Sequence, residues 1–99
     1  MQRVRRLLAQ PSYRRSEGAF VVEGAQLVGE ALRAGTVLEG LYVAPEGLDL
    51  AVVSQAEAGG VRVFPLARGV IERVSDTVTA QPVLAVAPLP AASLEGVTD

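Results

Sequence analysis

The feature that most constrains the fold of this chain is an alternation of short apolar runs with segments of helical periodicity. Four runs of strand length stand out, namely FVV, LYVA, VRVF and VLAVA. Strands that alternate with helices predict a sheet covered by helices on both faces. Continuous apolar runs are typical of strands that are buried on both sides. The sequence therefore predicts an α/β fold, specifically a three-layer α/β/α sandwich with about four mostly parallel strands.

Glycine and proline residues set the expected limits of these elements. We expect helices over residues 2–10, 25–34, 50–58 and 67–74, and strands over residues 19–23, 38–44, 61–64 and 83–87. Pro11 is expected to end the first helix and to leave a polar loop over residues 11–17. Asp49 is a suitable N-cap for the third helix. A buried stripe on the second helix is predicted at Leu27, Val28, Ala31 and Leu32.

The length and the end of the chain suggest one domain followed by a connecting segment. Ninety-nine residues are enough for one domain. From Pro88 onward the composition changes, and residues 88–93 have the character of a semi-rigid linker. Residues 94–99 are typical of the start of another apolar element. We therefore expect one domain over residues 1–87, and a linker with a truncated further element over residues 88–99.

Three absences limit the chemistry of the chain. It contains no His, no Cys and no Lys. The usual general base near neutral pH, thiol nucleophiles, Schiff-base chemistry and the phosphate-loop lysine are therefore missing. We expect no catalytic residues, no metal site and no cofactor site in this chain, which disfavours a complete small enzyme. The lack of cysteine and of a secretory or membrane-spanning segment favours the cytoplasm.

The net charge of −2 hides a strong asymmetry. Residues 1–15 contain five arginines and no acid, so this arm carries +5. The other four arginines face eleven acidic residues, which leaves −7 on the rest of the chain. A basic arm on an acidic body suggests an anionic partner, although a charged terminus can also serve solubility alone. The arginines of the arm are Arg3, Arg5, Arg6, Arg14 and Arg15.

The junction between the first strand and the second helix is a candidate binding corner. Gly24 follows Glu23 at the point where the strand pattern becomes a helix pattern. The free N–H groups of a helix start can hold a phosphate, and Glu23 can accept hydrogen bonds from a base or pair with an arginine of the arm. An ordinary strand-to-helix turn explains the same residues. Tyr13 offers a stacking face or simple packing, and residues 75–81 offer hydrogen-bonding groups or ordinary turn chemistry.

An ordered set of segments carries a family resemblance. It comprises the arginine-rich residues 1–15, then residues 20–32, 41–43, 60–63, 74–79 and 81–86. Together these segments resemble the N-terminal substrate-binding domain of the SpoU (TrmH-type) RNA ribose 2′-O-methyltransferases. The resemblance implies a fold like that of the kink-turn-binding ribosomal proteins and a role in holding ribosomal or transfer RNA. It carries RNA contact to Arg14, Arg15, Glu23, Gly24 and Gln26, and also to Thr79 and Gln81.

The resemblance also implies what this chain lacks. In the family, methyl transfer belongs to a separate C-terminal knotted domain that binds S-adenosylmethionine and usually dimerises. Residues 94–99 are similar to the first strand of that domain. One departure is Pro82, where the family usually has glycine.

We therefore expect an RNA-binding substrate-recognition domain of a ribose methyltransferase, with no membrane or DNA partner and no activity of its own. The alternative is a protein-interaction module that docks a partner on its sheet edge or on a helix face.

Overall fold

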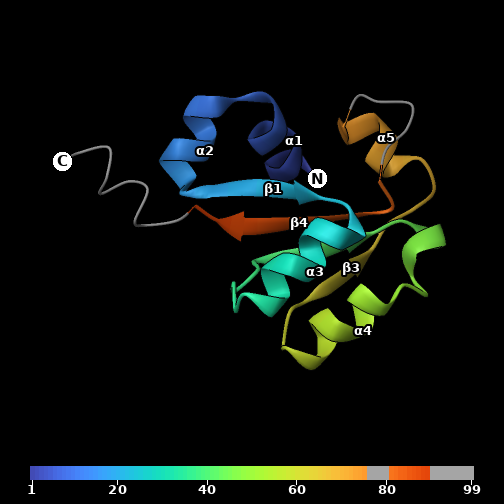
Figure 1. Cartoon of the computed structure of the whole chain (residues 1–99). Helices are drawn as coiled ribbons and strands as arrows, with labels where there is room; N and C mark the ends of the chain where they lie inside the picture. The colour runs from blue at the N-terminus through green and yellow to red at the C-terminus, as the bar shows by residue number, and fades with distance from the viewer. Residues whose placement is uncertain (76–80, 90–99) are drawn as a thin grey trace.

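The computed structural model describes residues 1–75 and 81–89 of the chain. A four-stranded sheet lies between two helical layers (Figure 1). The strands are β1 (Ala19–Glu23), β2 (Gly40–Val43), β3 (Val63–Pro65) and β4 (Val83–Pro88). One face carries α1 (Gln2–Ala9), α2 (Pro11–Glu17) and α5 (Val70–Ser75), and the other carries α3 (Ala25–Arg33) and α4 (Ala51–Ala58). A short 3₁₀ helix, η1 (Pro45–Gly47), follows β2. The predicted three-layer α/β fold is confirmed.

The strand order is β1-β4-β2-β3, and β4 runs against the other three strands. Three strands therefore point the same way, but only the β2–β3 pairing is parallel. β4 starts at the end of the sheet where β1 and β3 finish. The prediction of mostly parallel strands is therefore wrong, because the pairings of β4 with β1 and with β2 are antiparallel.

Two apolar clusters hold the layers together. Under α3 and α4, Val28 and Ala56 pack on Leu41, Val43 and the odd-numbered residues of β4. Under α1 and α5, a second cluster contains Val4, Leu7, Ala19, Ala44, Ile71, Val74, Leu84 and Val86. Residues 83–87 are all buried because β4 is central and covered on both faces. The continuous apolar run of β4 therefore reflects the burial of both faces of this strand, as expected.

The predicted polar loop over residues 11–17 is wrong, because these residues form α2. The backbone of Gln10 is extended, with φ −124° and ψ 104°, and this residue separates α1 from α2. Pro11 then occupies the first turn of α2, where its missing N–H costs nothing and its fixed φ suits a helix. The same proline ends one helix and begins the next.

Two local predictions about helices are also wrong. Leu27 is 54% exposed, whereas Val28 is fully buried and Ala31 and Leu32 are partly buried. The buried stripe of α3 is thus narrower than predicted, and Leu27 lies on its rim. The N-cap of α4 is Leu50, which makes no side-chain cap hydrogen bond, so Asp49 does not cap this helix. The remaining predicted helices and strands exist, with ends that differ by up to three residues.

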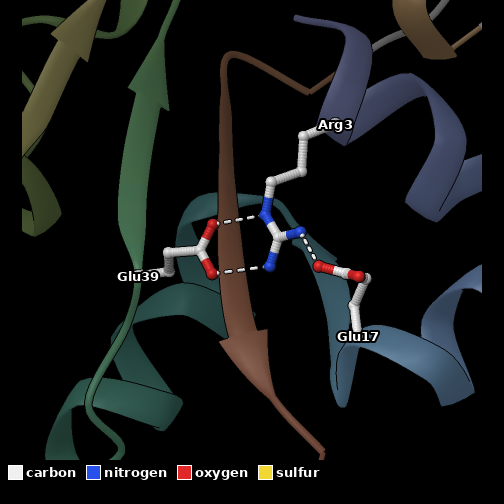
Figure 2. Close-up of polar contacts among 3 residues, drawn as sticks. All are labelled: Arg3, Glu17 and Glu39. Carbon is white, nitrogen blue, oxygen red and sulfur yellow. Dashed lines mark hydrogen bonds and ion pairs between the residues drawn. The ribbon is translucent and has the colours of Figure 1, made fainter.

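An arginine clamp ties α1 to the sheet (Figure 2). The Arg3 guanidinium donates to both carboxylate oxygens of Glu39, with Nε–Oε2 at 2.6 Å and Nη2–Oε1 at 2.8 Å. Its Nη1 donates to Oε1 of Glu17 at 2.6 Å. Glu17 ends α2, and Glu39 directly precedes β2. One side chain therefore connects the first helix, the second helix and the start of a strand.

The clamp predicts a dependence of stability on pH. Hydrogen bonds from Arg3 hold the pKa of Glu39 below its ordinary value. A carboxylate with a lowered pKa stabilises the fold above its unfolded-state pKa, and this contribution is lost as pH falls through the folded-state pKa. Because Glu39 is 46% exposed, the contribution is discounted to about 1 kcal/mol.

We expect Glu39→Gln to lower the free energy of unfolding near neutral pH and to reduce its loss between about pH 6 and about pH 3. Urea denaturation at both pH values measures the two quantities. The matched control is Glu57→Gln, an exposed change on α4 outside the clamp. The same pH dependence in both variants would contradict the role given to the clamp.

Candidate functional site

The predicted corner is built around the backbone of Gly24. This residue has φ 101° and ψ 148°, a region that only glycine occupies readily. Its N–H donates to the carbonyl oxygen of Val83 at 3.0 Å, and its own carbonyl accepts from Val28 N–H at 3.0 Å. Gly24 therefore ends the β1–β4 ladder and begins the hydrogen-bonding pattern of α3.

Gln81 completes the corner from the other end of the sequence. A Cβ atom on Gly24 would lie 3.3 Å from Gln81 Oε1, so the Gln81 side chain rests on the glycine backbone. Residues 23–27 and Gln81 together line a small, mainly polar cavity of about 240 Å³. The structure thus brings together Glu23, Gly24, Gln26 and Gln81, all of which were predicted as site residues.

The corner is equipped for hydrogen bonding. The N–H groups of the first turn of any helix have no partner inside the helix, and Gly24 provides no side-chain cap for α3. Glu23 and Gln26 are exposed beside this turn and add acceptor and donor groups. Glu23 forms neither of the ion pairs found in the described ranges, both of which belong to Arg3. The cavity lining contains no nucleophile–base pair.

Three arginines of the arm have partners inside the fold. Arg3 forms the clamp. Arg14 Nη1 donates to the carbonyl oxygens of Leu7 at 2.6 Å and Leu8 at 3.3 Å, and so satisfies carbonyls that the end of α1 leaves open. Arg6 lies over the Tyr13 ring at 4.1 Å from its centroid, a cation–π contact.

Tyr13 is also packed against the second apolar cluster, which supports its role in packing. The positive charge of residues 1–15 is therefore partly engaged within the domain.

The other two arginines are differently placed. Arg15 is exposed on α2. Arg5 lines a cavity of about 370 Å³ between α1 and α5, together with Arg73 and Ser75. The Ser75 Oγ atom is buried and has no hydrogen-bond partner in the part of the chain that the structure describes. Arg73 was not predicted as a site residue, since only its charge marked it within a helix of otherwise ordinary composition.

The structure separates the predicted residues into two groups. α2 ends just before β1 begins, whereas Glu23 is the last residue of β1. Arg14 and Arg15 therefore lie near one end of this strand, and the corner lies at the other. Figure 1 shows α5, the arrowhead of β1 and the start of β4 at the corner's end of the sheet, with α2 at the opposite end. Thr79 lies outside the described residues, as do residues 90–99 and with them most of the predicted linker segment.

Neither a cluster of metal ligands nor a membrane-spanning helix is found in the described ranges. No group of three or more Asp or Glu side chains there is arranged to hold a metal ion. No helix in the same ranges has the length and apolar character needed to cross a membrane.

Comparison with known families and structures identifies this architecture. A family model described as the MRM3-like substrate binding domain matches residues 1–85. The chain belongs to this family. The resemblance seen in the sequence is thereby confirmed. A comparison with curated protein sequences gave no match.

Solved structures agree with the family assignment. A TrmH-family protein from Porphyromonas gingivalis is 30% identical over 91% of this chain and 34% of its own, with a TM-score of 0.66. An RNA 2′-O ribose methyltransferase is 28% identical over 91% and 34%, with a TM-score of 0.72. The AdoMet-bound rRNA methyltransferase from Sinorhizobium meliloti shares the fold at 24% identity over 90% and 33%, also with a TM-score of 0.72. The chain spans about a third of the length of each.

Pro82 is the residue at which the sequence departs from the usual family pattern. Its carbonyl oxygen accepts a hydrogen bond from Ala44 N–H at 2.9 Å. This bond links the start of β4 to the end of β2, directly beside the corner. The backbone at Pro82 therefore has a structural role that does not require an N–H group.

The geometry of Gly24 predicts an unequal pair of glycine substitutions. We expect Gly24→Ala to lower the free energy of unfolding by about 3 kcal/mol, because its backbone region is nearly closed to other residues. The added methyl group would also press on the Gln81 side chain. Gly60 has φ 85° and open space around it, so Gly60→Ala should cost only about 1 kcal/mol. Urea denaturation of both variants tests this, and equal losses would contradict it.

Proposed function

We propose that this chain is the RNA-binding substrate-recognition domain of an S-adenosylmethionine-dependent RNA ribose 2′-O-methyltransferase, acting on ribosomal or transfer RNA. The observation that carries the proposal is the corner itself. Residues 23–27 and Gln81 converge on one polar cavity at a helix start. They do so in a chain that belongs to a substrate-binding family.

The corner is suited to reading RNA by hydrogen bonds. The amide groups of Gln26 and Gln81 each offer donors and an acceptor, and the N–H groups at the start of α3 favour an anion. RNA presents 2′-hydroxyls, phosphates and the edges of unpaired bases, which match these groups. Glu23 accepts from a hydroxyl or a base amino group and would repel a phosphate. The corner therefore holds a sugar or base through Glu23 and Gln81, with a phosphate nearer the helix start.

The cavity between α1 and α5 supplies positive charge for the same RNA. Arg5 and Arg73 both line it, beside the buried hydroxyl of Ser75. Guanidinium groups bind phosphate oxygens through their planar fork. Only residues 76–80 separate Ser75 from Gln81 in the sequence, and Thr79 is among them. Because α5 and the corner lie at the same end of the sheet (Figure 1), we propose that an RNA bound at the corner also reaches Arg5 and Arg73.

The arginines of the arm divide into two roles under this proposal. Arg5 and Arg15 contact phosphates, because neither has an ion-pair or hydrogen-bond partner in the described part of the chain. Arg3 and Arg14 mainly hold the fold through their bonds to Glu39 and to α1. Arg6 retains a charged edge above Tyr13 that an RNA base or phosphate can reach.

The cofactor and the further domain of the whole protein are proposed from its relatives. The S. meliloti protein is an rRNA methyltransferase with AdoMet bound, and we propose the same cofactor for the protein to which this domain belongs. The cofactor and the catalytic residues would lie in a C-terminal domain that also forms a homodimer. We propose a cytoplasmic protein whose nucleic-acid partner is RNA and not DNA.

The first test uses salt dependence. The domain is titrated with labelled ribosomal and transfer RNA fragments, followed by fluorescence anisotropy, between about 50 mM and about 200 mM salt. We expect Arg5→Gln to reduce the slope of log K against log salt by about 0.7 to 0.9, because one phosphate contact is lost. Arg62→Gln, a matched charge change directly before β3 at the sheet edge opposite β1, should leave the slope unchanged. Salt-independent binding, no binding, or equal effects of the two variants would refute RNA recognition.

The second test distinguishes the hydrogen bonds of the corner from the phosphate contacts of the arginines. Gln81→Ala removes neutral hydrogen bonds, so we expect RNA affinity to fall about tenfold with the salt slope unchanged. Gln55→Ala on α4, away from the corner, is the matched control. A thermal melt shows whether either variant is misfolded. RNA affinity that is unaffected by Gln81→Ala in a folded variant would remove the corner from the binding surface.

A further inference from the structure

A second surface of the domain differs in chemistry from the corner and from the arginine cavity. A groove of about 600 Å³ lies between β1 and α3. Residues 20–23 line one side, and Leu27, Glu30, Ala31 and Ala34 line the other. The groove is mainly apolar, and its charged lining residues are the two acids Glu23 and Glu30.

The floor of this groove is an open sheet edge. Within residues 1–75 and 81–89, β1 is a terminal strand of the sheet and pairs with β4 alone. Gly24 N–H donates to Val83, and Leu89 N–H donates to Gly18. Hydrogen-bonded pairs alternate along an antiparallel ladder, so the even-numbered residues from 18 to 24 face β4.

The odd-numbered residues of β1 therefore direct their N–H and C=O groups outward. Ala19 is buried, which leaves Val21 and Glu23 as the accessible ones. Neither residue's N–H has a backbone partner outside the ladder among the described residues. An unpaired edge of this kind is a template for another strand.

The wall of the groove explains the exposure of Leu27. Residues 27, 30, 31 and 34 stand at spacings of three and four, so they share one face of α3. On this face Leu27, Glu30 and Ala34 are exposed beside the edge of β1, whereas Ala31 also packs against the first apolar cluster. Leu27 is 54% exposed, and Phe20 is only partly buried. The groove thus offers apolar contacts directly beside the open backbone groups.

The charge of the groove lining indicates which kind of strand can bind there. RNA is disfavoured, because the charged lining residues are acids. A second copy of β1 would bring another Glu23 and no cation. Residues 89–99 of this chain contain Glu95 and Asp99 and no basic residue, so they do not supply the missing charge either.

We propose that the β1 edge and the α3 groove bind an extended, apolar and basic segment of a partner protein. The segment adds a strand to the sheet by pairing with Val21 and Glu23, which is recognition by β-strand addition. Its apolar side chains fill the space beside Leu27 and Ala31, and its cations meet Glu23 and Glu30. This function goes beyond RNA binding, and the groove adjoins the corner, with which it shares Glu23 and Leu27.

The test uses a blocked hexapeptide of alternating valine and arginine with a fluorescent label. Anisotropy gives its affinity, and amide hydrogen exchange by NMR locates its site. We expect the bound peptide to slow exchange at Val21 and Glu23 by about tenfold or more. The same peptide N-methylated at every residue keeps its charge but cannot donate backbone hydrogen bonds, and it should lose most of its binding.

Charge variants complete the test. Glu30→Gln should weaken peptide binding about threefold, whereas Glu57→Gln on α4 makes the same charge change away from the groove and should have no effect. Equal binding of the N-methylated peptide, or equal effects of the two variants, overturns the proposal.

Protection of Val21 by self-association, with a dimer seen in sedimentation, would assign the edge to a second copy instead. Protection by an RNA fragment would assign it to RNA. Either result also overturns the proposal.

Discussion

The rest of the structure depends on the burial of β4 between two strands and two helical layers. Residues 83–87 of this strand are all buried, and its two edges are paired with β1 and β2. The same strand makes the corner, because Val83 accepts the N–H of Gly24 and Gln81 precedes the strand by two residues. Core packing and candidate site are thus fixed by one element, and a change in the β1–β4 register would disrupt both.

Several of the arginines in the first fifteen residues make contacts within the folded domain. Arg3 joins two carboxylates, Arg14 binds the last carbonyls of α1, and Arg6 covers Tyr13. These contacts attach a helical layer to a sheet. They leave Arg5 and Arg15 as the outward charges of the arm and add Arg73 from a distant segment. The surface also has a mainly apolar groove beside β1, whose charged lining residues are the acids Glu23 and Glu30.

Much of the fold could be predicted because local patterns carry it. Apolar runs gave the four strands, and glycines marked the ends of α3 and α4. The failures have local causes that a sequence pattern does not resolve. Pro11 was interpreted as the start of a loop, although proline is equally suited to the first turn of a helix. Leu27 was placed in the core because helical spacing shows which residues share a face, and not how wide the buried stripe is.

The sequence by itself determined the α/β class, the strand segments, the corner at Gly24 and the lack of His, Cys and Lys. Only the tertiary structure decided that β4 lies between β1 and β2, because strand order depends on long-range packing. It also decided which arginines are engaged, since their partners Glu39 and Leu7 are set by how helices dock on the sheet. Gln81 lies against Gly24 for a similar reason, because β1 and β4 pair although they are about sixty residues apart in the sequence.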